Sequence, residues 1–371
     1  MPSTEAIRLP SEERFAHELA ALQAADTYER PPGWQLSPRM VEVFVMGSDG
    51  ESLPGPNGQP IPISPKYIGQ RRLIQVAIVT LASERSLLLI GEPGTAKSWV
   101  SEHLAAAISG NSRLIVQGTS GVTEDQTKYT WNYALLLAEG PSERALIESP
   151  IMRAIRNGQI VRFEEMTRCA SEIQDTLLSI LSEKELSIPE LGQVVPARRG
   201  FNLIATANTR DRGVNEMSSA LKRRFNFVLL PQTEDMDVEM RIVEQRTHEL
   251  MGDYAIRADI PADVLALIVT VFRELRQGKT EDGETQVKSP RSVMSTAEAI
   301  SVLLDACALA QHFGKGQVEA SDLVPGLRAA VAKEQVQDGD ILDEYLETVA
   351  RTREDEHWQQ LYEAGRATPT T

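Results

Sequence analysis

One stretch in the first third of the chain constrains the fold more than any other. An apolar run over residues 87–90 is followed directly by the loop GEPGTAKS, residues 91–98, and then by apolar residues at helical spacing. A strand, a glycine-bearing loop and a helix in this order aim successive backbone N–H groups and a helix N-terminus at one point. The sequence therefore predicts an anion site at this loop.

The loop also carries the two side chains that a nucleotide phosphate needs. Lys97 would neutralise the β and γ phosphates, and the Ser98 hydroxyl would be a ligand of Mg²⁺. We expect the whole loop to contact the nucleotide: Gly91, Glu92, Pro93, Gly94, Thr95, Ala96, Lys97 and Ser98. Ala96 stands where the G-x-x-x-x-G-K-[ST] pattern has a second glycine. A methyl group is tolerable there if the residue has a negative φ.

A later apolar run ends in two carboxylates. Residues 160–163 form a β-type run that leads into Glu164 and Glu165. Ligands of an open parallel sheet bind outside the carboxyl ends of its strands, so both acids should face the phosphate loop. We assign Glu164 to Mg²⁺ through water, and Glu165 to orienting the attacking water and taking its proton. Arg162, inside the same run, is a buried charge that needs a partner.

Three further polar residues are candidates for contact with the terminal phosphate. Asn208 follows the β-type run 201–207 and either bonds the attacking water or a phosphate oxygen, or simply forms a turn. Arg224 lies in ALKRRF, where paired arginines are otherwise solvated charges, and Arg291 precedes a long helix. Charge develops on the oxygens of a transferring phosphoryl group, and enzymes meet it with arginines, some of them from a neighbouring subunit.

The chain divides into four regions by pattern. Residues 1–66 predict one helix over about 11–25 and then a proline-rich, extended connector. Residues 67–231 alternate five short β-type runs with helical stretches, which is typical of a parallel sheet with helices on both faces. Residues 232–336 have helical periodicity only, and residues 337–371 predict an acidic, solvated helical tail.

Composition and charge exclude several classes of protein. The net charge of −15 argues against a general nucleic-acid binder, which needs a basic face. No apolar run reaches about 18 residues and the N-terminus is polar, so we expect neither a membrane span nor a signal peptide. Two cysteines are too few for a disulfide framework or a zinc site. We therefore expect a cytoplasmic protein.

Together these residues resemble an AAA+ ATPase, and more narrowly the MoxR family of the helix-2-insert branch. The resemblance rests on Ile-Gly-Gln at 68–70, GEPGTAKS, the acid pair, ATAN, ALKRRF and SPRS, in that order, and it covers about residues 67–336. The alanine before the lysine in GEPGTAKS is itself a MoxR-like form. The resemblance implies an α/β P-loop NTPase core, with a five-stranded parallel sheet and helices on both faces, plus a C-terminal all-α lid. It also implies that Ile68 and Gly69 line the adenine site.

The same resemblance gives the polar residues named roles. Asn208 would be sensor 1, and Arg291 would be sensor 2 on the helical lid. Arg224 would be the arginine finger that reaches the ATP of a neighbouring subunit, with Arg223 as the alternative.

Two insertions typical of this branch are also expected. Residues 121–157 are too many for a plain helix, and residues 186–200 predict a hairpin before sensor 1. Such loops line the central pore in relatives, so Trp131 and Tyr133 either contact substrate there or pack under the insert.

We therefore expect a Mg²⁺-dependent ATPase that forms a ring, of six subunits, and remodels a protein client. The resemblance further implies a partner with a von Willebrand factor A domain. The alternatives are the ATPase subunit of a metal chelatase, a nucleotide-gated scaffold with little turnover, which the Glu at position 164 in place of Asp favours, and a DNA or RNA motor. GTP is disfavoured because no N-K-x-D sequence occurs.

Overall fold

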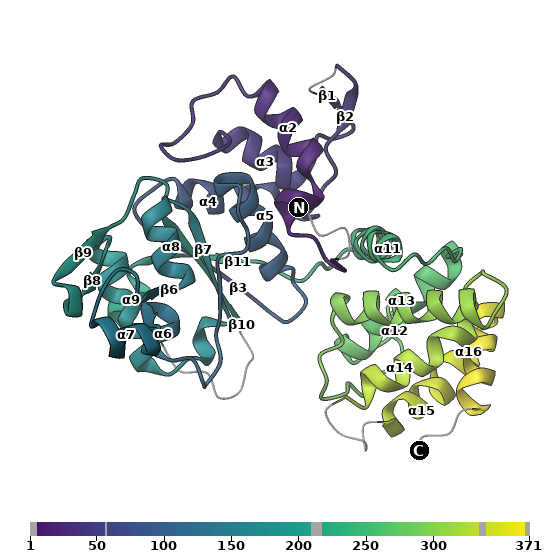
Figure 1. Ribbon diagram of the computed structural model, residues 1–371. Helices are drawn as coiled ribbons and strands as arrows, with labels where there is room; N and C mark the ends of the chain where they lie inside the picture. The colour runs from purple at the N-terminus through teal and green to yellow at the C-terminus, as the bar shows by residue number, and fades with distance from the viewer. Residues whose placement is uncertain (1–5, 56–57, 209–216, 334–338, 368–371) are drawn as a thin grey trace. The chain divides into compact units, whose positions relative to one another are not determined.

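A computed structural model of the chain describes residues 6–55, 58–208, 217–333 and 339–367 (Figure 1). The chain divides into two compact units. One unit is Leu9–Glu92 with Ala96–Pro231, and the other is Gln232–Thr371 with Met1–Arg8 and Pro93–Thr95. No helix within the described ranges is long and apolar enough to cross a membrane.

The first unit is built on a five-stranded parallel sheet in the order β11-β3-β10-β7-β4. The strands are β3 (Ser86–Gly91), β4 (Ile115–Gln117), β7 (Ile160–Glu164), β10 (Asn202–Asn208) and β11 (Phe225–Leu229). The five strands predicted from the sequence are confirmed. Because β10 lies between β3 and β7, the phosphate loop and the acid pair leave the sheet on either side of a single strand.

Helices cover both faces of this sheet. The strand side chains alternate between two buried clusters, as the two-residue period of a strand requires. Leu87 and Leu89 join the cluster under α4 (Arg71–Leu81) and α5 (Lys97–Ser109), whereas Leu88 joins the opposite one. The opposite cluster lies under α8 (Pro150–Asn157) and α9 (Ser171–Glu183).

The N-terminal segment differs from its prediction. The expected helix is broken at Phe15 into α1 (Ser11–Arg14) and α2 (Ala16–Ala25). The expectation of an extended connector is wrong, because it contains α3 (Pro38–Met46). Proline at the first helical position loses no hydrogen bond, and the Ser37 side chain caps the helix by accepting from Met40 N.

The rest of this segment contains a short hairpin, and the segment packs against the sheet unit. β1 (Ser52–Pro54) pairs with β2 (Pro60–Pro62), where prolines are tolerated because no third strand needs their N–H groups. Leu22, Phe44 and Val45 are fully buried in the cluster that contains α4 and α5. The segment is therefore part of the core and no linker.

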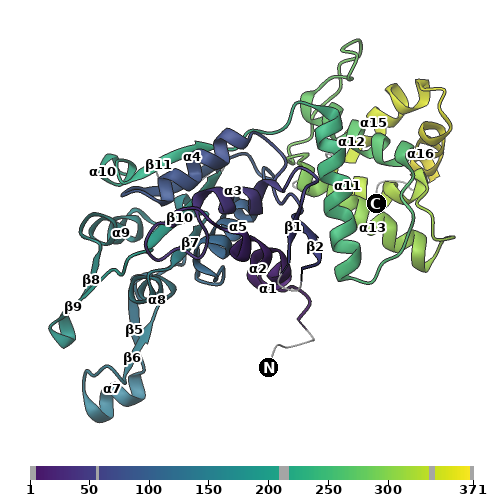
Figure 2. The same ribbon diagram turned by 90° about the horizontal axis from the view of Figure 1, so that it is seen from above.

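Two hairpins extend from the sheet unit, as Figure 2 shows. The first follows α6 (Glu124–Thr127) and pairs β5 (Tyr129–Trp131) with β6 (Leu146–Glu148), with α7 (Tyr133–Glu139) between the strands. The second pairs β8 (Glu185–Ile188) with β9 (Gln193–Pro196). They occupy the two stretches that the sequence marks as insertions.

Within the described residues, the second unit contains helices and no β-strand. Its helices are α11 (Met236–Asp253), α12 (Ala262–Gln277), α13 (Thr296–His312), α14 (Val324–Val331), α15 (Gly339–Thr348) and α16 (Glu356–Ala367). They enclose one apolar core.

The C-terminal tail belongs to this core, which corrects the expectation of a solvated tail. Leu342, Tyr345, Leu346 and Leu361 are buried among the side chains of the other helices. The apolar residues of α15 follow helical spacing and face inward, while its acidic residues face solvent. The acidic residues that favoured a solvated tail lie on the outer face of α15.

Candidate active site

The phosphate loop leads from β3 into α5. Helix α5 begins at Lys97, and its N-cap residue, Ala96, supplies no side-chain hydrogen bond to the first turn. Lys97 is buried, and its Nζ donates to the carbonyl oxygens of Gly91 (3.1 Å) and Glu92 (2.7 Å). The lysine thus folds back over its own loop, beside a helix N-terminus suited to an anion.

Ala96 does not have the negative φ that we expected. Its φ is +65°, in the left-handed region, as is the φ of Gly94 at +81°. A left-handed conformation costs a residue with a Cβ about 1–2 kcal/mol. The phosphate loop of this chain therefore holds backbone strain at the position where the common pattern has glycine.

Glu164, at the end of β7, is buried and accepts several side-chain hydrogen bonds. It is only 3% exposed. Its Oε2 accepts from Ser98 Oγ at 2.6 Å and from Thr206 Oγ1 at 2.7 Å. Burial alone raises the pKa of this carboxyl, but Arg162 and the surrounding hydroxyls outweigh burial and leave the pKa below its ordinary value. Glu164 is therefore ionised at neutral pH.

The pair formed by Ser98 and Glu164 fits Mg²⁺. Hydroxyl and carboxylate oxygens are the hard ligands that this ion prefers, and it binds through few protein groups and several waters. The two side chains lie within hydrogen-bond distance of each other although they are 66 residues apart in the sequence.

Glu165 differs from its neighbour in exposure and in backbone geometry. Its side chain is about one third exposed, its φ is +52°, and its backbone N–H donates to Thr206 Oγ1 at 3.0 Å. Its Oε2 lies 3.0 Å from Arg168 Nη1. The turn is closely packed: a Cβ at Gly118 would lie 2.3 Å from the Glu165 carbonyl oxygen. The turn directs one carboxylate inward and presents the next to solvent.

Sequence reasoning missed Thr206, which joins the two acids. It lies on β10, and its hydroxyl donates to Glu164 and accepts from the Glu165 backbone. The strand alternation offered the signal: residue 206 lies two positions before Asn208 in a β-type run expected beside the acid pair. Asn208 is paired in register with Gly91, so the predicted sensor 1 lies beside the first residue of the phosphate loop.

The remaining predicted residues lie on other elements of the chain. Ile68 and Gly69 precede α4, and their segment is tied to α5 by a hydrogen bond from Trp99 Nε1 to the Lys66 carbonyl oxygen (2.8 Å). Arg291 is exposed in the helical unit, before α13. The roles of Ile68, Gly69 and Arg291 stay predictions.

Arg223 and Arg224 are both exposed between α10 (Ser219–Lys222) and β11. Arg224 Nε donates to Ser182 Oγ at 2.7 Å. Arg224 is therefore bonded to α9 of its own chain, on which Ser182 lies.

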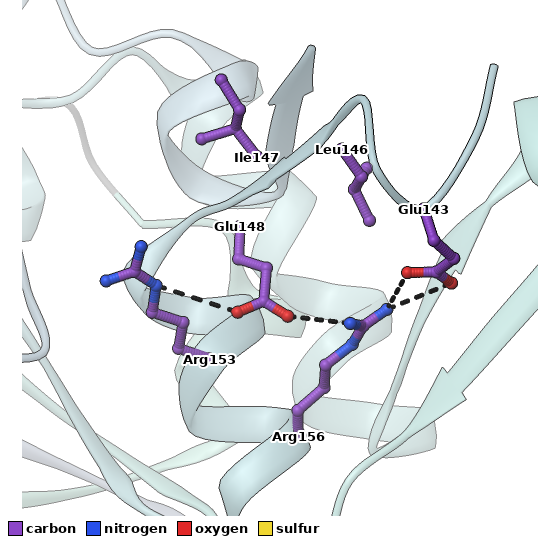
Figure 3. A pocket seen from close by; sticks show the side chains of 6 residues that line it. All are labelled: Glu143, Leu146, Ile147, Glu148, Arg153 and Arg156. Atoms are coloured by element: carbon purple, nitrogen blue, oxygen red, sulfur yellow. Dashed lines mark hydrogen bonds and ion pairs between the residues drawn. The ribbon is translucent and has the colours of Figure 1, made fainter. Parts of the chain in front are cut away.

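A separate, strongly charged pocket of about 370 Å³ lies on the first hairpin and α8 (Figure 3). It is lined by Glu143, Leu146, Ile147, Glu148, Arg153 and Arg156. Arg156 pairs with Glu143 at 3.1 Å and with Glu148 at 2.8 Å, while Arg153 lies 3.8 Å from Glu148. These charges compensate one another, and none of the predicted nucleotide-binding residues lines the pocket.

Comparison with known proteins places the chain in a family. A model of the AAA domain of the dynein-related subfamily matches residues 86–225, and a model of the YehL-like AAA+ ATPase C-terminal domain matches residues 237–368. The uncharacterized protein YehL of Escherichia coli is 41% identical, with 98% of each chain covered. An uncharacterized protein of Staphylococcus haemolyticus is 28% identical over 46% of this chain and 64% of its own.

Among solved structures, NtrX of Brucella abortus in complex with ADP is similar in fold, with a TM-score of 0.50 and 14% identity over 82% of this chain and 65% of NtrX. The match to the C-terminal domain of the family extends to residue 368 and therefore includes α15 and α16. The same two helices contribute to the apolar core of the helical unit in this chain. On the evidence of the full-length match, the chain belongs to the YehL-like AAA+ ATPases, which hydrolyse ATP with Mg²⁺.

Proposed function

We propose that this protein is a MoxR-type AAA+ ATPase that assembles into a ring of six subunits and uses ATP hydrolysis to remodel a protein client. The observation that carries the proposal is the cluster at the ends of β3 and β7. It holds a lysine over a phosphate loop, a buried carboxylate against the Ser98 hydroxyl, and a second, accessible carboxylate one residue later. These are the parts that phosphoryl transfer to water requires.

Each residue of the cluster has a distinct role in the proposal. Lys97 neutralises the β and γ phosphates, and Ser98 with Glu164 holds the metal ion. Mg²⁺, when bound, offsets the charge that develops on the phosphate oxygens. Glu165 orients a water and accepts its proton, which its exposure allows. Asn208, beside Gly91, bonds the terminal phosphate or the water.

The sheet geometry supports a ring in which Arg224 acts on the neighbouring subunit. Arg224 immediately precedes β11, and its carbonyl oxygen accepts from the N–H of Ser86, the first residue of β3. The phosphate loop begins at the other end of β3, at Gly91. Five steps of about 3.3 Å separate the two ends by about 16 Å. Arg224 therefore serves a phosphate of another subunit better than its own.

A mixing experiment tests the ring. Arg224→Ala alone should lose hydrolysis, and so should Glu165→Gln alone. A mixture should recover part of the activity, because an Arg224→Ala subunit keeps its Glu165 and can receive the arginine of a Glu165→Gln neighbour. Phosphate release is measured across mixing ratios. If no ratio restores activity while Arg223→Ala mixtures do, the finger is Arg223; if neither does, no arginine of this pair acts across subunits.

The first hairpin is the proposed site of client contact. Tyr133 and Leu137 on α7 are 64% and 88% exposed. Trp131 is only half-buried and packs edge-on against Tyr129, with ring centroids 5.9 Å apart. Exposed aromatic and aliphatic side chains on one projecting helix suit binding of an apolar client segment.

The client and the partner are addressed by affinity purification of the Glu165→Gln variant in ATP. The variant should retain its client because it binds ATP without completing hydrolysis. We expect a protein with a von Willebrand factor A domain among the retained proteins. Recovery of a large porphyrin-binding subunit instead would identify the chain as the ATPase of a metal chelatase.

A further inference from the structure

Arg162 is a buried cation in a central strand of the sheet. It lies on β7 between β10 and β4, and it is only 6% exposed. Residues two apart on a strand share a face, so Arg162 and Glu164 both point toward α5. A guanidinium is costly to bury unless its donors are paired.

The N–H groups of Arg162 donate to acceptors in three parts of the site. Nε donates to Ser101 Oγ at 2.9 Å, and Nη1 donates to the Ser112 carbonyl oxygen at 3.2 Å. Nη2 donates to the Ser98 carbonyl oxygen at 3.0 Å and to Glu164 Oε1 at 2.9 Å. One side chain thus connects the first turn of α5, the segment before β4 and the carboxylate at the end of β7.

The Glu164 carboxylate is consequently held from two sides. Ser101 Oγ (2.6 Å) and Arg162 approach Oε1, while Ser98 and Thr206 approach Oε2. An aspartate is one methylene shorter and cannot keep both sets of donors from the same backbone position. The length of Glu164 therefore matches the presence of Arg162 and Ser101.

We propose that Arg162 and Ser101 are positioning residues that aim Glu164 Oε2 at the Ser98 hydroxyl, and that Arg162 is the reason the chain carries glutamate at this position. The proposal rests on the assignment of Ser98 and Glu164 to Mg²⁺ made above. The proposal predicts that the two positions depend on each other. Glutamate at position 164 holds Mg²⁺ better than aspartate only while Arg162 is present. Once Arg162 is replaced by an apolar side chain, aspartate becomes an acceptable ligand.

The test is a double-mutant cycle on full-length protein. The variants are Arg162→Met, Glu164→Asp and the double variant. For each, ADP affinity is measured by calorimetry with Mg²⁺ and again with EDTA, and the ratio of the two dissociation constants gives the gain in affinity due to the metal. The melting temperature is measured alongside. The gain, unlike the melting temperature, does not respond to a merely structural role.

Each single variant should lower the metal-dependent gain about tenfold or more, as loss of groups that orient a metal ligand typically does. The double variant should recover a gain above that of Glu164→Asp. If the two losses multiply in the double variant, or if the melting temperatures fall while the gain is unchanged, the proposal is wrong. A wild-type protein with no gain from Mg²⁺ would instead overturn the assignment of Glu164 itself.

A milder pair of variants keeps the test decisive if Arg162→Met does not fold. Ser101→Ala removes one donor to Glu164 and one acceptor of Arg162. Ser109→Ala is its matched control, because Ser109 is also buried on α5 and its Oγ accepts one hydrogen bond, from Ile160 N at 2.7 Å. Only Ser101→Ala should reduce the metal-dependent gain; equal effects of the two variants would contradict the proposal.

Discussion

Two buried carboxylates, one in each unit of the chain, are surrounded by very different donors. Glu164 in the sheet unit accepts from three hydroxyls and one guanidinium. Glu239 in the helical unit is 1% exposed. It accepts hydrogen bonds from both Arg273 and Arg276, and one from the hydroxyl of Thr296. Hydroxyls rotate and can redirect a hydrogen bond, whereas a guanidinium is a rigid fork.

The Glu239 cluster ties together the elements around it. Arg276 also donates to the Met294 carbonyl oxygen at 2.9 Å, and Arg273 also pairs with Glu281 at 2.7 Å. The cluster thereby joins α11, α12 and the start of α13, and no predicted nucleotide ligand contributes to it. A carboxylate bonded by two rigid guanidinium groups suits a structural role. A carboxylate bonded largely by hydroxyls suits a site that must also accommodate a metal ion.

The largest effect on stability is expected from Glu239→Ala. The substitution removes the buried carboxylate that the buried Arg273 and the partly buried Arg276 share, which should lower the free energy of unfolding of the helical unit by about 3–5 kcal/mol. Urea unfolding followed by fluorescence measures it in a background that retains Trp358 on α16, with Trp34, Trp99 and Trp131 of the sheet unit replaced by phenylalanine. The control is Glu344→Ala, which breaks an exposed pair with Lys288 and should cost less than about 1 kcal/mol. Equal costs would remove the distinction between buried and exposed pairs.

A smaller effect is expected from Tyr345→Phe, which tests whether the C-terminal helices are part of the scaffold. The fully buried hydroxyl of Tyr345 donates to Glu274 Oε2 at 2.5 Å, and phenylalanine keeps the ring. Loss of a bond to a charged group should cost about 1–3 kcal/mol in the free energy of unfolding. Tyr362→Phe on α16 is the matched control, since its hydroxyl is exposed where it contacts Glu347. A solvated tail would make the two substitutions equivalent.

The smallest effect is expected at Ala96, in the phosphate loop. Ala96→Gly relieves a left-handed backbone but adds freedom to the unfolded chain, so it should raise the free energy of unfolding by about 0.5 kcal/mol. Ala105→Gly, in the interior of α5, the helix that follows the loop, should lower the free energy of unfolding by about 1 kcal/mol or more. Thermal unfolding of the two variants should therefore shift in opposite directions. A loss of stability at position 96 would show that the loop is not strained.

Much of the sheet unit was predictable because its patterns are local. The five β-type runs match the observed strands to within two residues at each end, and the loop before Lys97 has a spacing that few other structures require. Burial of a charge at Arg162, and with it the need for a partner, could also be anticipated from the run around it. The structure identifies Glu164 as that partner.

Part of what the sequence did not reveal depends on contacts between distant residues, and part on local backbone geometry. Thr206 and Ser101 are ordinary hydroxyl residues until the fold brings them to Glu164. The left-handed φ of Ala96 is set by the loop and not by its own preference. The many prolines in the N-terminal segment led to the prediction of a connector where α3 lies. The position of Pro38 at the start of the helix matters more than the number of prolines.

In the proposed mechanism, Glu165 at the end of β7 activates the water that attacks ATP bound by the loop before α5. Phosphate release and ATP binding, measured together at saturating Mg-ATP for the wild type, Glu165→Gln and Lys97→Ala, test it most directly. We predict that Glu165→Gln binds ATP as the wild type does but releases phosphate at least about 100-fold more slowly, and that Lys97→Ala loses binding. Full turnover by Glu165→Gln would show that Glu165 does not activate the attacking water.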